Sequence, residues 1–406
     1  MRATVRQSVW IGLDQVVSSL GNIALVVWVA RNSAFEAGQV AVGMSIVVIC
    51  SAVARGFDAD WRLVDAISNV HRGSMAPSLV VFLSTLCLLA LVSFTAGAQL
   101  LVILIACCCA IPVALIEVFR IRLQLVGRSS VGVYAQVSWL LCLVAGLVMM
   151  GTEASGALAL GVWGIAAIPS SLMYVGLALK SQLGVPIYGE FPSIRRRLSF
   201  AFDSGIQSGS TQLLMPLLLI LGGPSTAGVA RLALSMLGPV NITFTALWRV
   251  RLPTLSQQLA MGGSASLYRA TGSLAVALLA VAFGFAGALR LVPVRIGTQL
   301  MGPIWLDIAR SWLWLAAFGA VGAVTAVCWI LLRIRRRDGL VLVSRFGALL
   351  LRLIFTGISV RYWADGDAVA SLGFGAGAAL APWVLAVALS EYSGRGEPDA
   401  ATLRSP

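Results

Sequence analysis

Charged residues are scarce in this sequence of 406 residues: they make up 11% of it, whereas 59% of it is hydrophobic. A soluble chain carries about 25% charged residues, because its surface must face water. No long stretch here has an ordinary soluble composition. The sequence therefore excludes a large catalytic domain, a secreted disulfide scaffold and a soluble nucleic-acid-binding protein.

Residues that support metal and acid–base chemistry are also few. The chain has one histidine, His71, and its seven cysteines all lie inside apolar runs. Cys107, Cys108 and Cys109 are consecutive, so on a helix they point in three directions and cannot form one ligand face. We therefore expect no metal site, no cofactor and no enzymatic activity. The sequence also has no Walker-type glycine loop, so we expect no transport driven by ATP hydrolysis within this chain.

The sequence does contain many long apolar runs, each near the roughly 20 residues that a helix needs to cross a bilayer. The run from 77 to 118 has twice that length, and residues 96–99 (Ala-Gly-Ala-Gln) offer a hairpin within it. We therefore predict an all-α polytopic membrane protein with 12 transmembrane helices. The predicted spans are 10–30, 38–54, 77–97, 98–118, 131–151, 157–179, 199–222, 226–247, 271–292, 309–332, 340–360 and 368–390.

The net charge of +13 comes almost entirely from arginine, since Lys180 is the only lysine. With a cytoplasmic N-terminus, most arginines fall in inner loops and few in the short outer loops, as the positive-inside rule requires. The charge thus indicates orientation and contact with anionic membrane lipids, with no nucleic-acid partner. This orientation places both termini in the cytoplasm. The preference for arginine over lysine is typical of GC-rich bacterial coding, so we expect a bacterial cytoplasmic membrane. In the loop 55–72 a short helix on the cytoplasmic surface is predicted by the helical spacing of Phe57, Trp61, Val64 and Ile67.

The second half of the sequence echoes the first. Residues 13–19 (LDQVVSS) match 202–208 (FDSGIQS), and 37–40 (AGQV) match 227–230 (AGVA). Six predicted spans per half, in the same orientation, indicate two lobes related by a parallel internal repeat. We predict an N-terminal six-helix lobe at 1–180, a cytoplasmic linker at 181–198, a C-terminal six-helix lobe at 199–390 and a cytoplasmic tail at 391–406.

Polar residues inside the predicted spans are the best indication of a site, because lipid cannot solvate them. They form a stripe on the first span and a second stripe on the seventh. Two interpretations remain open: a common substrate cavity between the lobes, or hydrogen bonds that hold neighbouring helices together. The stripes comprise Asp14, Gln15, Ser18 and Asn22, and Asp203, Gln207, Thr211 and Gln212.

Four further residues are candidates for binding or gating. Arg31 and Arg231 lie near the predicted outer ends of the first and eighth spans, and a guanidinium is suited to phosphate oxygens. The alternative for both is contact with outer headgroups. Glu117 and Arg120 share a face at the inner end of the fourth span, as an inner gate or as a simple i, i+3 ion pair. Arg352, midway along the eleventh span, has no partner that the sequence identifies.

These residues resemble a known family. Asp14, Ser18, Asn22, Arg31 and the segment 35–38 (FEAG) are similar to the opening of polysaccharide-biosynthesis flippases of the MATE/MOP superfamily. That opening has a polar first helix, an Ala-Arg pair and a Phe-Gly-type turn, whereas here residues 36–37 (Glu-Ala) separate the Phe from the Gly. The inner-loop pattern from Arg120 to 127–128 (Gly-Arg), and the stretch Gly228, Arg231, Gly238, Pro239 and Pro253, also resemble the family.

The resemblance implies a flippase that moves a polyprenyl-(di)phosphate-linked oligosaccharide from the cytoplasmic to the outer leaflet by alternating access. It implies a role in surface polysaccharide assembly, with membrane lipids and polysaccharide-assembly proteins as further partners, and we expect a monomer. Sugar hydroxyls would suit the amides of Gln15, Asn22, Gln207 and Gln212, and a phosphate would suit Arg31 or Arg231. Protonation of Asp14 or Asp203 is a hypothesis for coupling to an ion gradient.

Other functions stay open at this point. A multidrug or small-solute antiporter of the same superfamily would share the layout but would favour acids and aromatics in its cavity. A major-facilitator carrier would show a Gly-x-x-x-Asp-Arg motif that residues 55–62 do not match. A membrane-embedded glycosyltransferase or polymerase acts on the same lipid carriers but needs a substantial outer loop, and none is predicted here.

Overall fold

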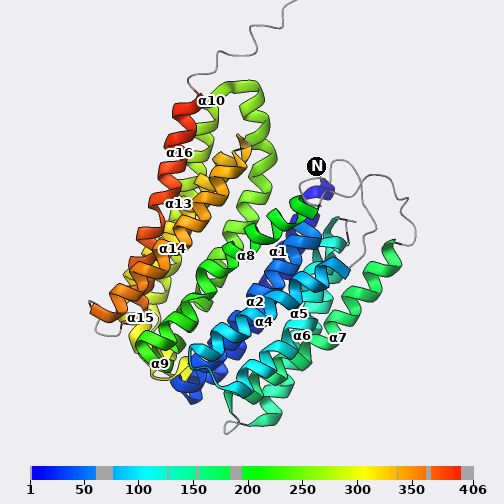
Figure 1. Ribbon diagram of the computed structural model, residues 1–406, viewed down its shortest axis with the longest axis vertical. Helices are drawn as coiled ribbons and strands as arrows, with labels where there is room; N and C mark the ends of the chain where they lie inside the picture. The colour runs from blue at the N-terminus through cyan, green and yellow to red at the C-terminus, as the bar shows by residue number, and fades with distance from the viewer. Residues whose placement is uncertain are drawn as a thin grey trace, which may run out of the picture.

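The computed structural model describes residues 2–60, 76–125, 128–151, 155–182, 194–335, 337–362 and 367–394, and these are almost entirely helical, with no strand among them. Figure 1 shows two groups of long helices that lie side by side. One group comes from the first half of the chain and the other from the second half. The end of the bundle at which α1 begins is called the inner end below, because it is the predicted cytoplasmic side.

In the first half, short connections join α1 to α2, α4 to α5 and α6 to α7. The turn between α4 and α5 includes Gly97 at φ +81°, a left-handed conformation that favours glycine, and it confirms the hairpin predicted at residues 96–99. The elements are α1 (Arg2–Asn32), α2 (Ala34–Arg55), the π-helical η1 (Gly56–Asp60), α4 (Ala76–Thr95), α5 (Leu100–Leu125), α6 (Ser129–Met150) and α7 (Gly156–Gln182).

The second half is less regular. Gly223, at φ +82° and ψ 175°, interrupts α9 and divides it into two helical parts. The elements are α8 (Ile194–Gln212), α9 (Leu214–Met236), α10 (Gly238–Leu291), α11 (Val294–Met301), α12 (Ile304–Arg310), α13 (Trp312–Ile334), α14 (Asp338–Tyr362), α15 (Ala368–Ala379) and α16 (Ala381–Gly394).

Ten segments of the described chain are long and apolar enough to cross a membrane, which confirms the all-α polytopic fold class. One of them, Arg197–Met236, has 40 residues and contains the break at Gly223. The shorter apolar helix Val81–Thr95 lies outside these ten. Two expectations stay predictions: the count of 12 crossings and the side of the membrane on which the termini lie. The lobe boundaries also stay predictions, because residues 183–193 of the expected linker lie outside the described part of the chain.

Helix α2 lies at the centre of the molecule, and 17 of its 22 residues are buried. Its small and β-branched residues allow close packing on α5, α8 and α9. A Cβ on Gly38 would lie 1.9 Å from the carbonyl oxygen of Pro224, and a Cβ on Gly228 would lie 2.7 Å from that of Ala34. The two glycines belong to the matched segments 37–40 and 227–230, so corresponding parts of the two halves meet here across an approximate two-fold relation.

Three sequence expectations are corrected by the structure. The stretch 248–270, expected as an inner loop, is helical within the 54-residue α10, which Figure 1 shows bending back on itself at the inner end. The predicted surface helix at 55–72 begins instead with η1, in which Phe57 and Asp58 are fully buried against α8; residues 61–72 lie outside the described part. The outer connection after α10 contains two short helices, α11 and α12, that were not expected.

Candidate functional site

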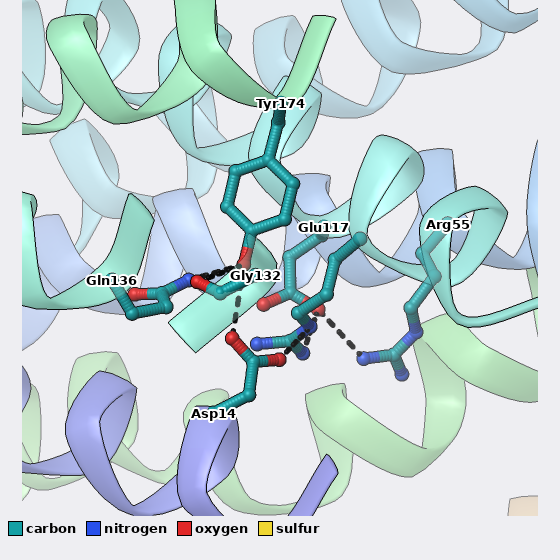
Figure 2. Close-up of polar contacts among 7 residues, drawn as sticks. Asp14, Arg55, Glu117, Gly132, Gln136 and Tyr174 are labelled. Carbon is teal, nitrogen blue, oxygen red and sulfur yellow. Dashed lines mark hydrogen bonds and ion pairs between the residues drawn. The ribbon is translucent and has the colours of Figure 1, made fainter. Parts of the chain in front are cut away.

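The first cluster of polar side chains surrounds Asp14, as Figure 2 shows. Asp14 is 1% exposed, and the hydroxyl of Tyr174 on α7 donates a hydrogen bond to its Oδ1 at 2.9 Å. The Nε of Arg120 on α5 lies 3.6 Å from Asp14 Oδ2. On α6, Gln136 Nε2 donates to the Tyr174 hydroxyl at 3.4 Å, and the carbonyl oxygen of Gly132 lies 3.1 Å from it. Asp14 therefore faces the interior of the first half, where α1 packs on α6 and α7.

Glu117 and Arg120, the predicted inner gate, extend this cluster toward α2. Arg120 Nη2 donates to Glu117 Oε2 at 2.6 Å, and Arg55 Nη1 donates to the same oxygen at 3.2 Å. The i, i+3 ion pair is thus present, and it also ties α5 to the end of α2 (Figure 2). A gating role for the pair stays a prediction. Buried charges inside a membrane protein need such partners, because an isolated ion there is costly.

A second cluster surrounds Asp203 on α8. Arg333 Nη2 on α13 lies 2.9 Å from Asp203 Oδ2, and Arg345 Nε on α14 lies 3.0 Å from Asp203 Oδ1. Arg345 Nη1 also donates to the carbonyl oxygen of Asp203 at 2.9 Å and to Gln207 Oε1 at 3.0 Å. Both guanidinium groups lie 5.7 Å from the ring of Trp329. Asp203 therefore faces the interior of the second half, whereas Gln207 contacts Arg345 but is exposed.

The two clusters follow the internal repeat. Asp14 and Asp203 occupy matched positions in segments 13–19 and 202–208. Each pairs with an arginine near the end of the helix that contains the fourth predicted span of its half, Arg120 on α5 or Arg333 on α13. The helix that contains the fifth predicted span of each half completes the cluster, with Gln136 on α6 and Arg345 on α14. The two clusters thus occupy corresponding positions in the two halves, but the second has a charged arginine where the first has a neutral glutamine.

Between the halves lies a third polar group, centred on Arg231 of α9. Arg231 is 6% exposed, and its Nη1 donates to Gln212 Oε1 on α8 at 2.6 Å. The hydroxyl of Ser45 on α2 donates to the same Gln212 oxygen at 3.3 Å, and Arg231 Nη2 lies 3.5 Å from the sulfur of Met44. Among the described residues no carboxylate lies within ion-pair distance of Arg231. A buried guanidinium thus lies where α2 of the first half meets α8 and α9 of the second.

The predicted stripe on the seventh span divides between two surroundings. Gln212 faces Arg231 and α2, whereas Asp203 and Gln207 face α13 and α14. Thr211 is partly buried beside Gln212.

The predicted residues on α1 also face different parts of the molecule. Asp14 faces α6 and α7, while Gln15, Ser18 and Asn22 are partly buried, and the Oδ1 of Asn22 is buried without a hydrogen-bond partner. The neighbouring Ser19 lies beside Gly238 of α10, so this side of α1 faces the second half. Arg31 is exposed at the end of α1. No contact between Arg31 and Arg231 occurs among the described residues, so the structure does not bring the two phosphate candidates together.

Several residues of these clusters were not identified from the sequence. Arg55 and Arg333 lie in predicted inner loops, where the positive-inside rule already accounts for an arginine. Tyr174 lies in the apolar sixth predicted span, where a tyrosine gives no separate signal. Arg345 carried a usable signal, since an arginine inside a predicted span requires a partner. The pairing of Gln136 with Tyr174 connects residues 38 positions apart on two helices, which periodicity on a single helix does not reveal.

The fold and the buried charges together define a class: a polytopic helical membrane protein with two matched halves, and with ionisable side chains at membrane depth inside and between them. No family model matches the sequence, and no curated protein matches it either.

Solved structures do match the fold over nearly the whole chain. An inward-facing multidrug resistance MATE family transporter of the MOP superfamily has a TM-score of 0.60 at 16% identity, over 97% of this chain and 96% of that one. A MATE protein in complex with MaD3S has a TM-score of 0.64 at 16% identity, over 96% and 95%. A MOP superfamily transporter from Pyrococcus furiosus, whose binding pocket is described as reversed in polarity with a different function suggested, has a TM-score of 0.60 at 14% identity, over 96% and 95%. The chain therefore has the fold of MATE transporters of the MOP superfamily.

Proposed function

We propose that this protein is a transporter that moves a polyprenyl-(di)phosphate-linked oligosaccharide from the inner to the outer leaflet by alternating access of its two halves. The observation that carries the proposal is Arg231, a buried guanidinium between the halves with no carboxylate at ion-pair distance in the described structure. A positive charge at membrane depth needs a counter-charge. A phosphate group of the substrate would supply one, because the planar guanidinium matches phosphate oxygens.

The depth of Arg231 supports a substrate role. Arg231 lies eight residues beyond the break at Gly223, which is about 12 Å along a helix at 1.5 Å per residue. The hydrocarbon core of a bilayer is about 30 Å thick, so with the break at Gly223 placed at the outer surface Arg231 would lie close to the midplane. Transporters built from repeated halves bind their substrates near this level. Gln212 and Ser45 lie beside Arg231 and offer amide and hydroxyl groups of the kind that sugars bind.

The acids at membrane depth favour an anionic substrate over a cationic drug. Asp14, Glu117 and Asp203 each have an arginine within ion-pair distance. A cationic drug would have to displace one of these arginines to reach a carboxylate. The reversed pocket polarity described for the Pyrococcus furiosus protein, for which a different function is suggested, is a precedent for more than one function on this fold. The fold by itself suits a multidrug antiporter equally well, so the experiment must separate the two functions.

The test is a depletion experiment with re-expressed variants. In depleted cells, polyprenyl-linked oligosaccharides are extracted and their sidedness is measured with a membrane-impermeant sugar oxidant. We expect one protected inner-leaflet species to accumulate, wild-type protein to clear it, and Arg231→Leu to fail at equal abundance in the membrane. Arg361→Leu is the matched control, because Arg361 is exposed at the end of α14. An unchanged lipid-linked pool together with increased accumulation of cationic dyes would contradict the proposal and favour the antiporter.

A further inference from the structure

Arg352 on α14 is a second arginine at membrane depth without a carboxylate at ion-pair distance among the described residues. It lies ten residues before the end of α14, about 15 Å along the helix and so near the bilayer midplane. Its Nη1 reaches Ser210 Oγ on α8 only at 3.5 Å, and its guanidinium lies 5.2 Å from the ring of Phe318 on α13. Its Nε is buried without a hydrogen-bond partner.

These contacts do not balance the charge of Arg352. One long hydrogen bond and one aromatic face offset only part of the cost of a cation in this setting. Leu351 and Phe355, on either side of Arg352 along α14, line an apolar cavity of about 560 Å³ between α13, α14 and α15. The residue as a whole is only partly buried, although its Nε is buried.

The first half of the chain shows that the fold does not need this charge. Position 210 corresponds to Gly21 in the repeat, since 203 corresponds to 14. In the first half Gly21 packs against Leu143, which follows Gln136 by seven residues on α6. In the second half Ser210 contacts Arg352, which follows Arg345 by seven residues on α14. The same packing position thus holds a glycine and a leucine in one half and a serine and an arginine in the other.

Arg352 and Arg231 belong to different sites. Arg352 contacts residue 210 of α8 and Arg231 contacts residue 212. Residues two apart on a helix differ by about 200° in direction, so the two arginines lie on opposite sides of α8. Arg231 faces α2 and the first half, whereas Arg352, on α14, faces α8 and α13. A single phosphate held by Arg231 therefore does not neutralise Arg352.

We propose that Arg352, positioned by Ser210, is an anion-binding site inside the second half, and that its ligand is an oxyanion of the phosphate class. The guanidinium offers its Nε–H and a neighbouring N–H as a two-donor fork to such an oxyanion. The Ser210 hydroxyl donates to the carbonyl oxygen of Gln207 at 2.8 Å and accepts from Arg352 Nη1, so it helps to orient the guanidinium. The ligand is either free phosphate or the phosphate of an anionic lipid headgroup. The site goes beyond the proposed transport function, because it requires neither the glycan nor Arg231.

The test is phosphate-dependent thermal stability of the purified full chain in nanodiscs of zwitterionic phosphatidylcholine. Ligand that binds the folded state raises Tm in a saturable way. We expect inorganic phosphate, titrated at constant ionic strength, to raise the Tm of wild type and of Arg231→Leu. We expect Arg352→Leu to reduce the rise if Arg231 also binds phosphate and to abolish it if Arg231 does not, and we expect none for Arg352→Leu combined with Arg231→Leu.

A second variant protects the test from misfolding: Arg352→Leu with Ser210→Gly reproduces the Leu143–Gly21 pair that the first half already uses. Arg361→Leu, on the same helix and exposed, should respond like wild type. A phosphate response of Arg352→Leu equal to that of wild type would overturn the proposal, as would a response that Arg231→Leu abolishes.

The source of the phosphate is decided by repeating the titration in nanodiscs that contain phosphatidylglycerol. A phosphate response that disappears there indicates a site already filled by a lipid headgroup, and a response that persists indicates free phosphate. Both results depend on Arg352 and support the site. Because the readout does not involve glycan transport, a failure of the proposed transport function would leave this result unaffected, and the reverse also holds.

Discussion

Replacing Gly38 by alanine should destabilise the contact between the two halves. The added Cβ would lie 1.9 Å from the carbonyl oxygen of Pro224, 2.6 Å from its carbonyl carbon and 2.8 Å from its Cα. All three are backbone atoms, so no side-chain rotation can relieve the overlap. Real Cβ contacts are almost never closer than 3.0 Å, and restoring that distance requires 3.0 − 1.9 = 1.1 Å of separation between α2 and α9.

The magnitude follows from the position of this contact. Overpacking a close-packed interior costs about 1–3 kcal/mol, and Gly38→Ala should lie at the upper end because two backbones must move apart. Gly228→Ala places its Cβ 2.7 Å from the carbonyl oxygen of Ala34, so 3.0 − 2.7 = 0.3 Å of movement relieves its closest overlap. We therefore expect a graded series in which Gly38→Ala lowers stability more than Gly228→Ala.

The assay is the Tm of each purified variant in one detergent, followed by tryptophan fluorescence. Gly284→Ala is the matched control, since Gly284 lies in α10 with nothing within 4 Å of its Cβ position. Alanine is favoured over glycine by up to about 1 kcal/mol inside a helix, so this variant should be unchanged or more stable. Equal Tm values for Gly38→Ala and Gly284→Ala would refute the packing argument.

Three more predictions concern buried polar contacts, and each is measured as the unfolding midpoint of purified protein. Asp14→Ala and Tyr174→Phe should each destabilise the protein, Tyr174→Phe by about 1–3 kcal/mol, and be non-additive when combined, because each removes the same hydrogen bond; simple additivity would contradict this. Asp203→Asn should cost about 3–5 kcal/mol, since it withdraws the carboxylate from two arginines; a smaller loss than for Asp14→Asn would be the opposite result. Asp367→Ala should cost about 1–2 kcal/mol, because Asp367 Oδ1 accepts the N–H groups of Val369 and Ala370 at the start of α15; an unchanged midpoint would show that this cap is dispensable.

The apolar runs predicted the fold class because each crossing needs about 20 apolar residues. This pattern can be recognised without knowing which helices pack against one another. The hairpin at residues 96–99 was equally visible, since a turn within a double-length run needs flexible residues. The continuity of α10 through 248–270 was not, because basic and polar residues there fit a solvated helix and a loop alike. The burial of Phe57 and Asp58 depends on Arg197 of α8, which lies 4.2 Å from the Phe57 ring and 3.8 Å from the Asp58 carboxylate. A contact between residues 140 positions apart cannot be predicted from the spacing of neighbouring residues in the sequence.

In the candidate site, too, contacts between residues close in sequence were predictable and contacts between distant residues were not. The ion pair of Glu117 and Arg120 follows from their i, i+3 spacing. The separation of Gln212 from Asp203 and Gln207 does not, because it depends on which neighbouring helices pack against each side of α8. The internal repeat added information that single helices lack, since it marked Asp14 and Asp203 as equivalent before either partner was known.

The charge of the two halves differs in a way that bears on substrate choice. The cluster in the first half contains two carboxylates, Asp14 and Glu117, and two arginines, Arg55 and Arg120, so it is balanced. In the second half Asp203 faces both Arg333 and Arg345, and Arg231 and Arg352 add two more positive charges near the midplane without a carboxylate at ion-pair distance among the described residues. A shared fold does not require this difference, because the first half packs a glycine and a leucine where the second packs Ser210 and Arg352. An excess of positive charge at membrane depth is costly to maintain without an anion to meet it. The asymmetry therefore favours an anionic cargo over a cationic one, and it locates the attraction in the second half and at its boundary with α2.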